Sequence, residues 1–282
     1  MSPNAPAGLT PFNGTASEEE QRRYQAMVGS ILYIYRCTRP DITVAVGIAS
    51  RFAANPGPEH FDLLLRIIRY LSHTKDMKLQ INGRKSPNLT AFCDADFAGD
   101  RTDRKSTSGY AVFLAGNLIS WTSTKQRCTA QSTMDAEFVA LNECSREVVY
   151  IKGLIEEMLG RSIKAMVFCD NAAAIAISKD SREHSRAKHI DVKYHYIREV
   201  LKQNTLEIEH VESSKNTADI LTKGLSRDCF HRHRQGLRVG RQVGASENAY
   251  SFPLNSDWVF SILGNVPFAP LIWLSVCSLG AD

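Results

Sequence analysis

The sequence predicts an α/β protein in which a mixed β-sheet is covered by helices. Three β-type runs follow one another at residues 89–99, 109–114 and 118–124, and the turn Ala115-Gly116-Asn117 predicts a hairpin between the last two. Helical and β-type segments alternate after residue 132, and such strand–helix–strand connections join parallel strands of one sheet. The antiparallel runs and the later crossovers together indicate a mixed sheet.

A small helical unit precedes this sheet. Ser17, followed by three glutamates, predicts a helix N-cap with acidic residues in the first turn. Apolar residues then recur at helical spacing. Further helices are predicted at 42–52, close after Pro40, and at 59–72, and a short strand is predicted at 78–81.

The second half of the chain supplies the remaining elements. Ser132 or Thr133 predicts the cap of a helix whose pattern continues to Gly160. Beyond it we expect a strand at 164–169, helices at 172–178 and 191–202, a strand at 206–211 and a final short helix at 217–225. The expected regions are a flexible start at 1–20, the helical unit at 21–84, the α/β domain at 88–226, and a basic segment with an apolar tail at 227–282.

Composition and charge favour a globular intracellular protein with an anionic partner. The 282 residues carry a formal net charge of +4 at pH 7, and the basic residues bunch in particular segments. Seven cysteines are widely spaced, and no Cys-x-x-Cys pair occurs. We therefore expect reduced core thiols instead of a disulfide framework. The first residues lack the apolar segment of a secretory signal.

Four carboxylates stand where they could converge. Asp94 ends the first strand, Glu137 lies one turn into the long helix, Asp170 ends the fourth strand, and Asp219 lies on the last short helix. If the first and fourth strands are parallel neighbours, Asp94 and Asp170 emerge side by side. Carboxylates so close repel one another unless cations neutralise them. Oxygen ligands suit Mg²⁺ or Mn²⁺, and two such ions about 4 Å apart suit attack of water on a phosphodiester.

These acids lie in motifs that resemble those of one family. The motifs are Phe-Cys-Asp-Ala-Asp-Phe-Ala-Gly around Asp94, Ala-Glu-Phe-Val-Ala-Leu around Glu137, Asp170-Asn171, and Ala-Asp-Ile-Leu-Thr-Lys around Asp219, with Arg104–Tyr110, Lys188–Asp191, Thr38–Ile42 and Arg69–Leu71. Over about residues 24–239 they resemble the C-terminal part of the Pol polyprotein of copia-type LTR retrotransposons. In that family this part holds the thumb-to-connection region of reverse transcriptase and a ribonuclease H domain.

The resemblance implies a ribonuclease H-like, mixed five-stranded sheet flanked by helices, with Asp94, Glu137, Asp170 and Asp219 binding two Mg²⁺ or Mn²⁺ ions. It implies a metal-dependent endonuclease that cuts the RNA strand of RNA–DNA hybrids during retrotransposon reverse transcription. The polymerase's own Asp-Asp motif is absent from this sequence, so DNA synthesis is not expected. Implied partners are the hybrid and other Pol segments, the polymerase palm and the integrase. The implied location is intracellular, in a cytoplasmic virus-like particle or the nucleus.

A second hypothesis comes from a different class of function. The same residues could belong to a catalytically silent, nucleic-acid-binding remnant of a decayed or co-opted element. Metal-dependent cutting of a hybrid separates this hypothesis from the nuclease hypothesis. A third possibility, a relative of the same fold that cuts DNA, is separated by replacing the hybrid with duplex DNA.

Basic and polar residues near the acids are candidates for contacts with nucleic acid. They are Arg104, Lys105, Ser106 and Ser108 after the first acidic strand, Asn171 after Asp170, and Arg186, Lys188 and His189 in a basic run. A solvated face is the alternative for such a run, and phosphate contacts would make binding salt-dependent. We expect Asp96 and Asp135 to lie near the metal ligands without being ligands, and His210 to belong to a strand.

The C-terminal segment departs from the family pattern after Val239. The run Cys229–Arg234 has ligand-type residues but no partner cluster at zinc spacing, so we interpret it as a basic surface helix end. Trp258–Ala281 is apolar and uncharged, but Pro267 and Pro270 interrupt it. We favour an out-of-family tail over a membrane anchor.

Overall fold

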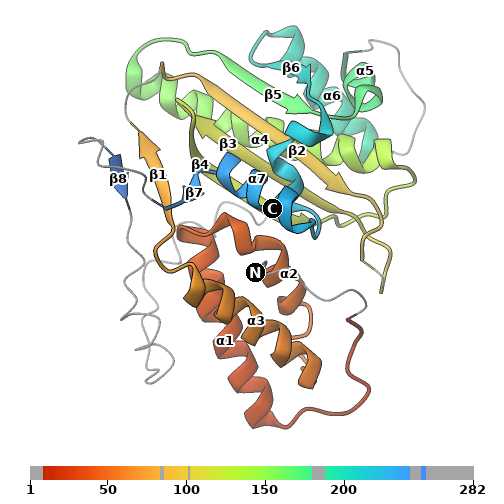
Figure 1. Cartoon of the computed structure of the whole chain (residues 1–282). Helices are drawn as coiled ribbons and strands as arrows, with labels where there is room; N and C mark the ends of the chain where they lie inside the picture. The colour runs from red at the N-terminus through yellow and green to blue at the C-terminus, as the bar shows by residue number, and fades with distance from the viewer. Residues whose placement is uncertain (1–8, 83–85, 101, 180–187, 242–248, 252–282) are drawn as a thin grey trace.

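The computed structural model describes residues 9–82, 86–100, 102–179, 188–241 and 249–251, the last of these ranges and 188–194 for the backbone alone. Three layers stack on one another in Figure 1: the helix α4, the central sheet, and a layer formed by α7 and the helical unit α1–α3. The predicted fold class, a mixed five-stranded sheet flanked by helices and preceded by a small helical unit, is confirmed.

The helices and strands follow the predicted order closely. The helical unit contains α1 (Glu18–Cys37), the 3₁₀ turn η1 (Pro40–Ile42), α2 (Thr43–Ser50) and α3 (Pro58–His73). The sheet region contains β1 (Lys78–Asn82), β2 (Leu89–Asp96), β3 (Thr107–Leu114), β4 (Asn117–Lys125), α4 (Thr133–Leu159), β5 (Ala165–Cys169), α5 (Ala172–Lys179), α6 (Lys188–Lys202) and β6 (Glu207–His210). The remaining elements are η2 (Ser213–Lys215), η3 (Thr217–Leu221), α7 (Arg227–Gly236), β7 (Val239–Gly240) and β8 (Ala249–Ser251).

The central sheet has the strand order β4-β3-β2-β5-β6. β2, β3 and β4 form the expected antiparallel meander, whereas β5 pairs parallel with both β2 and β6. The register pairs Cys93 of β2 with Cys169 of β5. The residues that follow these two cysteines, Asp94 and Asp170, therefore leave the sheet at the same edge, as the sequence predicted.

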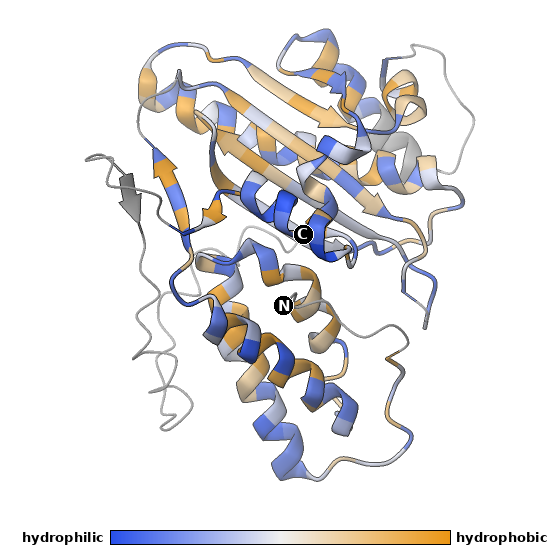
Figure 2. Ribbon diagram, viewed as in Figure 1, coloured by the Kyte–Doolittle hydropathy of each residue, from blue (hydrophilic) through white to orange (hydrophobic). Residues whose placement is uncertain are grey.

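Side chains alternate between two cores because successive residues of a strand face opposite sides of the sheet. On β3, Val112 packs in the core beneath α4, whereas Ala111 and Phe113 pack in the core shared with the helical unit. The same alternation on β2 sends Cys93 towards α4. Figure 2 shows these strands as largely hydrophobic ribbons between helices of mixed hydropathy. Both faces of β2 and β3 are thus covered, which fixes the register of these two strands.

The helical unit and the sheet share one core. Tyr24 and Ile67 of the helices belong to the same buried cluster as Leu221 of η3 and Phe230 of α7. β1 pairs antiparallel with β7 and β8 in a second, three-stranded sheet beside the unit. The helices therefore support the segment that carries Asp219.

A buried polar network ties the helical unit to α7. Arg39 is fully buried and donates from Nε and Nη2 to the two carboxylate oxygens of Asp41, at 2.8 Å each. The Tyr70 hydroxyl donates to Asp41 Oδ2 at 2.5 Å and accepts from Nη1 of Arg234 at 3.1 Å. Burial alone would raise the pKa of Asp41, but the Arg39 guanidinium outweighs it and the pKa lies below its usual value.

Two local features differ from the sequence-based expectation. The last short helix is a 3₁₀ turn, η3, that ends at Leu221. The basic run at Cys229–Arg234 is not a surface helix end, because Phe230, His233 and Arg234 of α7 are buried. Phe230 packs in the shared core and Arg234 joins the Asp41 network. One face of α7 is therefore buried, although the helix is polar by composition.

Among the described residues, no helix combines the length and apolar character that a membrane crossing requires. The apolar run Trp258–Ala281 lies outside the described residues, and so does the predicted region boundary at residue 84. The expected regions at 1–20, 21–84, 88–226 and 227–282 remain predictions.

Asp41→Asn should lower the free energy of unfolding by about 3–5 kcal/mol, because it leaves the buried Arg39 charge without its partner. Urea denaturation at neutral pH measures this loss. Glu18→Gln is the matched control: it breaks the Arg22–Glu18 pair, whose side chains are 79% and 86% exposed, and should leave stability almost unchanged. Equal effects of the two substitutions would contradict a structural role for the network.

Candidate active site

Two acidic side chains leave the sheet where β2 and β5 lie side by side. Asp94, on β2, is 1% exposed, and Asp170 immediately follows β5. Parallel pairing of the two strands places their carboxyl ends at one edge, so the two carboxylates meet without any help from a loop. This pairing is the first determinant of the site.

The turn η3 brings Asp219 to the same edge. Asn216 caps η3 by accepting from the Ala218 N–H at 3.2 Å, and its Nδ2 donates to the backbone carbonyl of Cys93 at 2.9 Å. This fully buried asparagine therefore fastens η3 to the residue before Asp94. One oxygen from each of Asp94, Asp170 and Asp219 lies within 4.8 Å of the others.

Gly109 allows η3 to approach the sheet this closely. It lies on β3 directly opposite Asp94 in the antiparallel register. A Cβ placed on Gly109 would lie 2.7 Å from Cγ2 of Thr222 and 3.0 Å from Cβ of Leu221. Any larger residue at this position would push the end of η3 away from Asp94.

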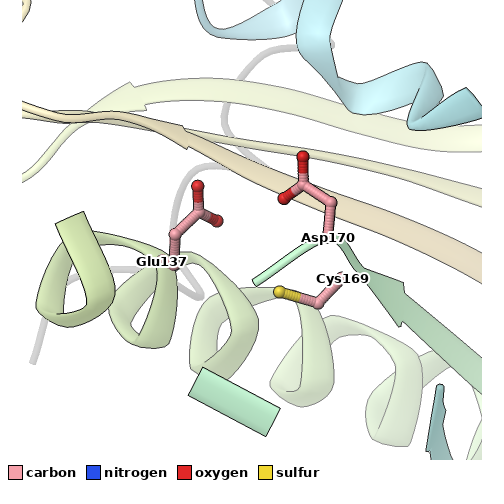
Figure 3. A group of neighbouring side chains, drawn as sticks. All are labelled: Glu137, Cys169 and Asp170. Atoms are coloured by element: carbon pink, nitrogen blue, oxygen red, sulfur yellow. The ribbon is translucent and has the colours of Figure 1, made fainter. Parts of the chain in front are cut away.

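Glu137 approaches from the opposite face, on the first turns of α4. Its carboxylate, the Sγ of Cys169 and the carboxylate of Asp170 form a second group whose atoms lie within 4.8 Å of one another (Figure 3). The four predicted acids thus form two groups that share Asp170. Glu137 joins the other three through Asp170 instead of lying in one cluster with them.

The concentration of negative charge changes the protonation of the buried acids. Burial raises the pKa of Asp94 to about 6, with Lys223 opposing the shift and Asp219 adding to it. Burial and the charge of Asp94 raise the pKa of Glu137 to about 9. Burial also raises the pKa of Asp219. Each raised pKa indicates that the ionised form of that carboxyl is destabilised in the site when no further positive charge is present.

Two residues that the sequence analysis did not identify partly offset this negative charge. Lys223 Nζ lies 3.2 Å from Oδ1 of Asp219 and 3.6 Å from Oδ2 of Asp94. The Thr222 hydroxyl donates to Oδ2 of Asp94. Both residues follow η3 within the Ala-Asp-Ile-Leu-Thr-Lys motif, so their position in that motif was the available signal. His233 of α7 is buried as well, and its burial lowers its pKa, so it adds no positive charge that offsets the carboxylates at neutral pH.

The donor set fits a hard divalent cation. The group of Asp94, Asp170 and Asp219 offers oxygen atoms only, which Mg²⁺ and Mn²⁺ prefer. A single lysine cannot neutralise three carboxylates, and Oε2 of Glu137 has no hydrogen-bond partner among the described residues. Both observations favour added positive charge at this edge of the sheet.

Comparison with known proteins identifies the relatives of the chain. The Pol polyprotein of tobacco transposon TNT 1-94 (Nicotiana tabacum) is 42% identical over 207 residues, which are 73% of this chain and 16% of that protein. Secreted RxLR effector protein 161 of Plasmopara viticola is 42% identical over 128 residues, which are 45% of this chain and 90% of that protein. No protein-family model matches the chain.

The chain is homologous to the Pol polyproteins of plant copia-type transposons. It spans 16% of the length of TNT 1-94 Pol, about one sixth of that polyprotein. The family resemblance stated from the motifs is therefore confirmed.

Solved ribonuclease H structures are also found among the similar folds. The N-terminal ribonuclease H domain of a Mycobacterium tuberculosis protein, solved as a fusion with maltose-binding protein, is 16% identical with a TM-score of 0.36, over 53% of this chain and 98% of that chain. The strand order and mixed register described above assign this copia-type Pol segment to the ribonuclease H-like fold class.

The residues after β2 that were predicted to contact nucleic acid are only partly accessible. Arg104 is exposed and Lys105 is partly exposed, so both can meet a ligand. Ser106 and Ser108 are fully buried: Ser106 Oγ accepts from the Ala98 N–H, and Ser108 Oγ accepts from Nε2 of Gln126. The prediction is wrong for these two serines, because their hydroxyls hold the loop and β4 in place and do not face a ligand.

The other predicted contact residues divide into two classes. Asn171, which directly follows Asp170, caps α5 by accepting from the Ala174 N–H at 3.0 Å. Arg186 lies outside the described residues. Lys188 and His189 are in the first turn of α6, and their side chains lie outside the described part of the chain.

The remaining polar residues named from the sequence lie around the site. Asp96, on the face of β2 that Asp94 also shares, is half-buried, and burial raises its pKa. Asp135 is in the first turn of α4, where its N–H donates to Ser132 Oγ at 3.1 Å. His210 is the last residue of β6, as expected, and is exposed.

Gly109→Ala should weaken both folding and metal binding, because the added methyl group displaces Thr222 and Leu221 from Asp94. We expect a loss of about 1–3 kcal/mol in the free energy of unfolding and a lower Mg²⁺ affinity by calorimetric titration. Gly153→Ala, at an exposed position of α4 with nothing within 4 Å, is the control and should stabilise by up to about 1 kcal/mol. Matching results for both variants would contradict the role of Gly109.

Glu137→Gln should flatten the pH dependence of stability in metal-free buffer. Because its folded pKa is raised to about 9, the stability contributed by its proton is complete below the unfolded pKa and is lost as the pH rises towards 9. We expect urea denaturation with EDTA to show a fall of a few kcal/mol between about pH 5 and about pH 9, smaller in the variant. Glu157→Gln, on the exposed face of α4, is the control. An unchanged slope in Glu137→Gln would disprove the assignment.

Proposed function

We propose that this Pol segment is a Mg²⁺- or Mn²⁺-dependent ribonuclease H, which cuts the RNA strand of RNA–DNA hybrids during retrotransposon reverse transcription. The observation that carries the proposal is the convergence of Asp94, Asp170 and Asp219 at the carboxyl ends of two parallel strands. Membership of the Pol family supports it, because hybrids are intermediates of reverse transcription.

The two groups of ligands suggest how two ions would be held. Asp94, Asp170 and Asp219 would hold one ion, and Glu137 with Asp170 would help to hold the second. When bound, such ions lower the pKa of an attacking water and stabilise the leaving 3′-oxygen. The raised pKa of Glu137 means that ion binding must displace a proton from this carboxyl at neutral pH.

The protein's own residues would orient these ligands. Thr222 donates to Oδ2 of Asp94, the same oxygen that Lys223 approaches, and so fixes the orientation of that carboxylate. Lys223 is 38% exposed at its side chain and contacts Asp94 and Asp219, so it limits their repulsion. Asn216 keeps η3 seated on β2. Together they fix the ligand positions before a substrate arrives.

Substrate contact would come from the loop after β2 and from the turn after β5. Arg104 and Lys105 can meet phosphates, and Asn171, which directly follows Asp170, is the proposed contact at the second turn. Contacts of this kind make hybrid binding salt-dependent. Other Pol segments, the polymerase palm and the integrase, are proposed partners, and an intracellular site in a virus-like particle or the nucleus is the proposed location.

Cleavage of a labelled RNA–DNA hybrid tests the proposal. The full chain should cut the RNA strand with Mg²⁺ or Mn²⁺ and not with EDTA. Asp94→Asn and Asp170→Asn should each reduce the rate by about 100-fold or more, since even indirect support of a metal ligand contributes about 10–100-fold. Glu157→Gln, which is remote from the site, should cleave normally.

The outcomes separate the three hypotheses. Salt-sensitive binding of the hybrid without cleavage in either metal would reject the nuclease hypothesis and support a catalytically silent nucleic-acid-binding remnant. Cleavage of duplex DNA in preference to the hybrid would support the proposed metal centre and show that the assigned substrate is wrong. Full activity of Asp94→Asn would reject the assigned site.

A further inference from the structure

A thiol lies among the carboxylates of the second group. Cys169 Sγ, a Glu137 oxygen and an Asp170 oxygen lie within 4.8 Å of one another, and Figure 3 shows the three side chains gathered between β5 and α4. The proposed hydrolysis uses the two carboxylates and has no need of sulfur. The group therefore contains chemistry that the nuclease proposal leaves unexplained.

The backbone explains why the sulfur lies at the end of the strand. Cys169 is the last residue of β5 and is fully buried on the face covered by α4. Its Sγ accepts from the backbone N–H of Asn171 at 3.5 Å, across the turn that leads into α5. Sulfur and the Asp170 carboxylate consequently flank the same turn, and Glu137 projects towards both from α4.

A second, independent observation is an unsatisfied oxygen. Glu137 is 8% exposed, and its Oε2 is buried without a hydrogen-bond partner among the described residues. A buried carboxylate oxygen without a partner costs about 1–3 kcal/mol or more. A cation bound at this position would remove that cost.

We propose that Glu137, Cys169 and Asp170 form a binding site for a thiophilic divalent cation of the Zn²⁺ class. One sulfur and two carboxylate oxygens are ligands that Zn²⁺ accepts, with a water in the fourth position. Mg²⁺ and Mn²⁺ have little affinity for sulfur, so the thiol distinguishes this site from the oxygen-only group at Asp94.

The site requires a modest closure and the release of protons. Zinc–sulfur bonds of about 2.3 Å and zinc–oxygen bonds of about 2.1 Å place tetrahedral ligands about 3.5 Å apart, so atoms now within 4.8 Å need to approach one another by at most about 1.3 Å. Binding displaces the proton of the Cys169 thiol and the proton that Glu137 carries at neutral pH, and both pass to solvent as the metal–sulfur and metal–oxygen bonds form. Side-chain rotation alone can supply the movement.

Asp170 belongs to both groups, so the two kinds of ion compete for it. Binding of the thiophilic ion stands independently of the proposed nuclease activity. Inhibition of Mg²⁺-dependent cleavage by Zn²⁺ is a consequence that rests on that proposed function. A binding readout therefore separates the failure of this inference from the failure of the nuclease proposal.

Cd²⁺ is the probe, because a cadmium–thiolate bond produces an ultraviolet charge-transfer absorption that oxygen ligands do not give. The full chain is used with Cys37, Cys128, Cys229 and Cys277 replaced by serine, which leaves the three buried thiols Cys93, Cys144 and Cys169. We expect a charge-transfer band that saturates near one equivalent of Cd²⁺. Cys169→Ser should abolish the band and weaken Cd²⁺ and Zn²⁺ binding at least tenfold, with Mg²⁺ binding retained.

Cys144→Ser is the matched control, because Cys144 is equally buried in the same core and lies outside the group. It should keep the band and the affinity. Glu137→Gln in the protein that retains Cys169 is the second variant, and it should weaken Cd²⁺ binding without removing a thiol. Absence of the band at saturating Cd²⁺, or an equal loss in Cys144→Ser and Cys169→Ser, would overturn the inference.

Discussion

The repulsion among buried carboxylates is the constraint on which this structure depends. Three acids meet within 4.8 Å at the edge of a sheet whose two faces are covered, and a fourth joins them through Asp170. Ionised carboxylates in such a place are stable only with counter-charge. Lys223 supplies one positive charge, and the raised pKa values of Asp94 and Glu137 show that it is not enough. This imbalance of charge supports the proposed cation binding.

The rest of the fold holds those charges in place against their repulsion. The parallel pairing of β2 and β5 sets Asp94 beside Asp170, and Gly109 and Asn216 let η3 lie flat on the sheet. The core shared with the helical unit backs η3 through Leu221. The helices before the sheet thus contribute to the site because they close the apolar face on which the Asp219 segment rests.

Much of this arrangement could be predicted from local patterns. The alternation in β2 and β3, the caps at Ser17 and Ser132, and the crossovers after α4 are encoded over a few residues each. Ser106 and Ser108 show where such reasoning fails. Their place in a polar loop indicated ligand contact, but the packing of β4 and α4 buries both hydroxyls. Burial of a short polar side chain depends on distant elements, which no local pattern records.

The sequence by itself determined the element order, the family, and the positions of the four acids, since periodicity, capping and motif order are properties of the chain. Only the tertiary structure decided that the acids form two groups sharing Asp170, that Lys223 and Thr222 contact them, and that Cys169 lies among them. Proximity between residues far apart in sequence depends on strand register and on how closely a turn packs on a sheet. A single substitution, for example of Gly109, would move η3 away from the sheet and leave the local sequence pattern almost unchanged.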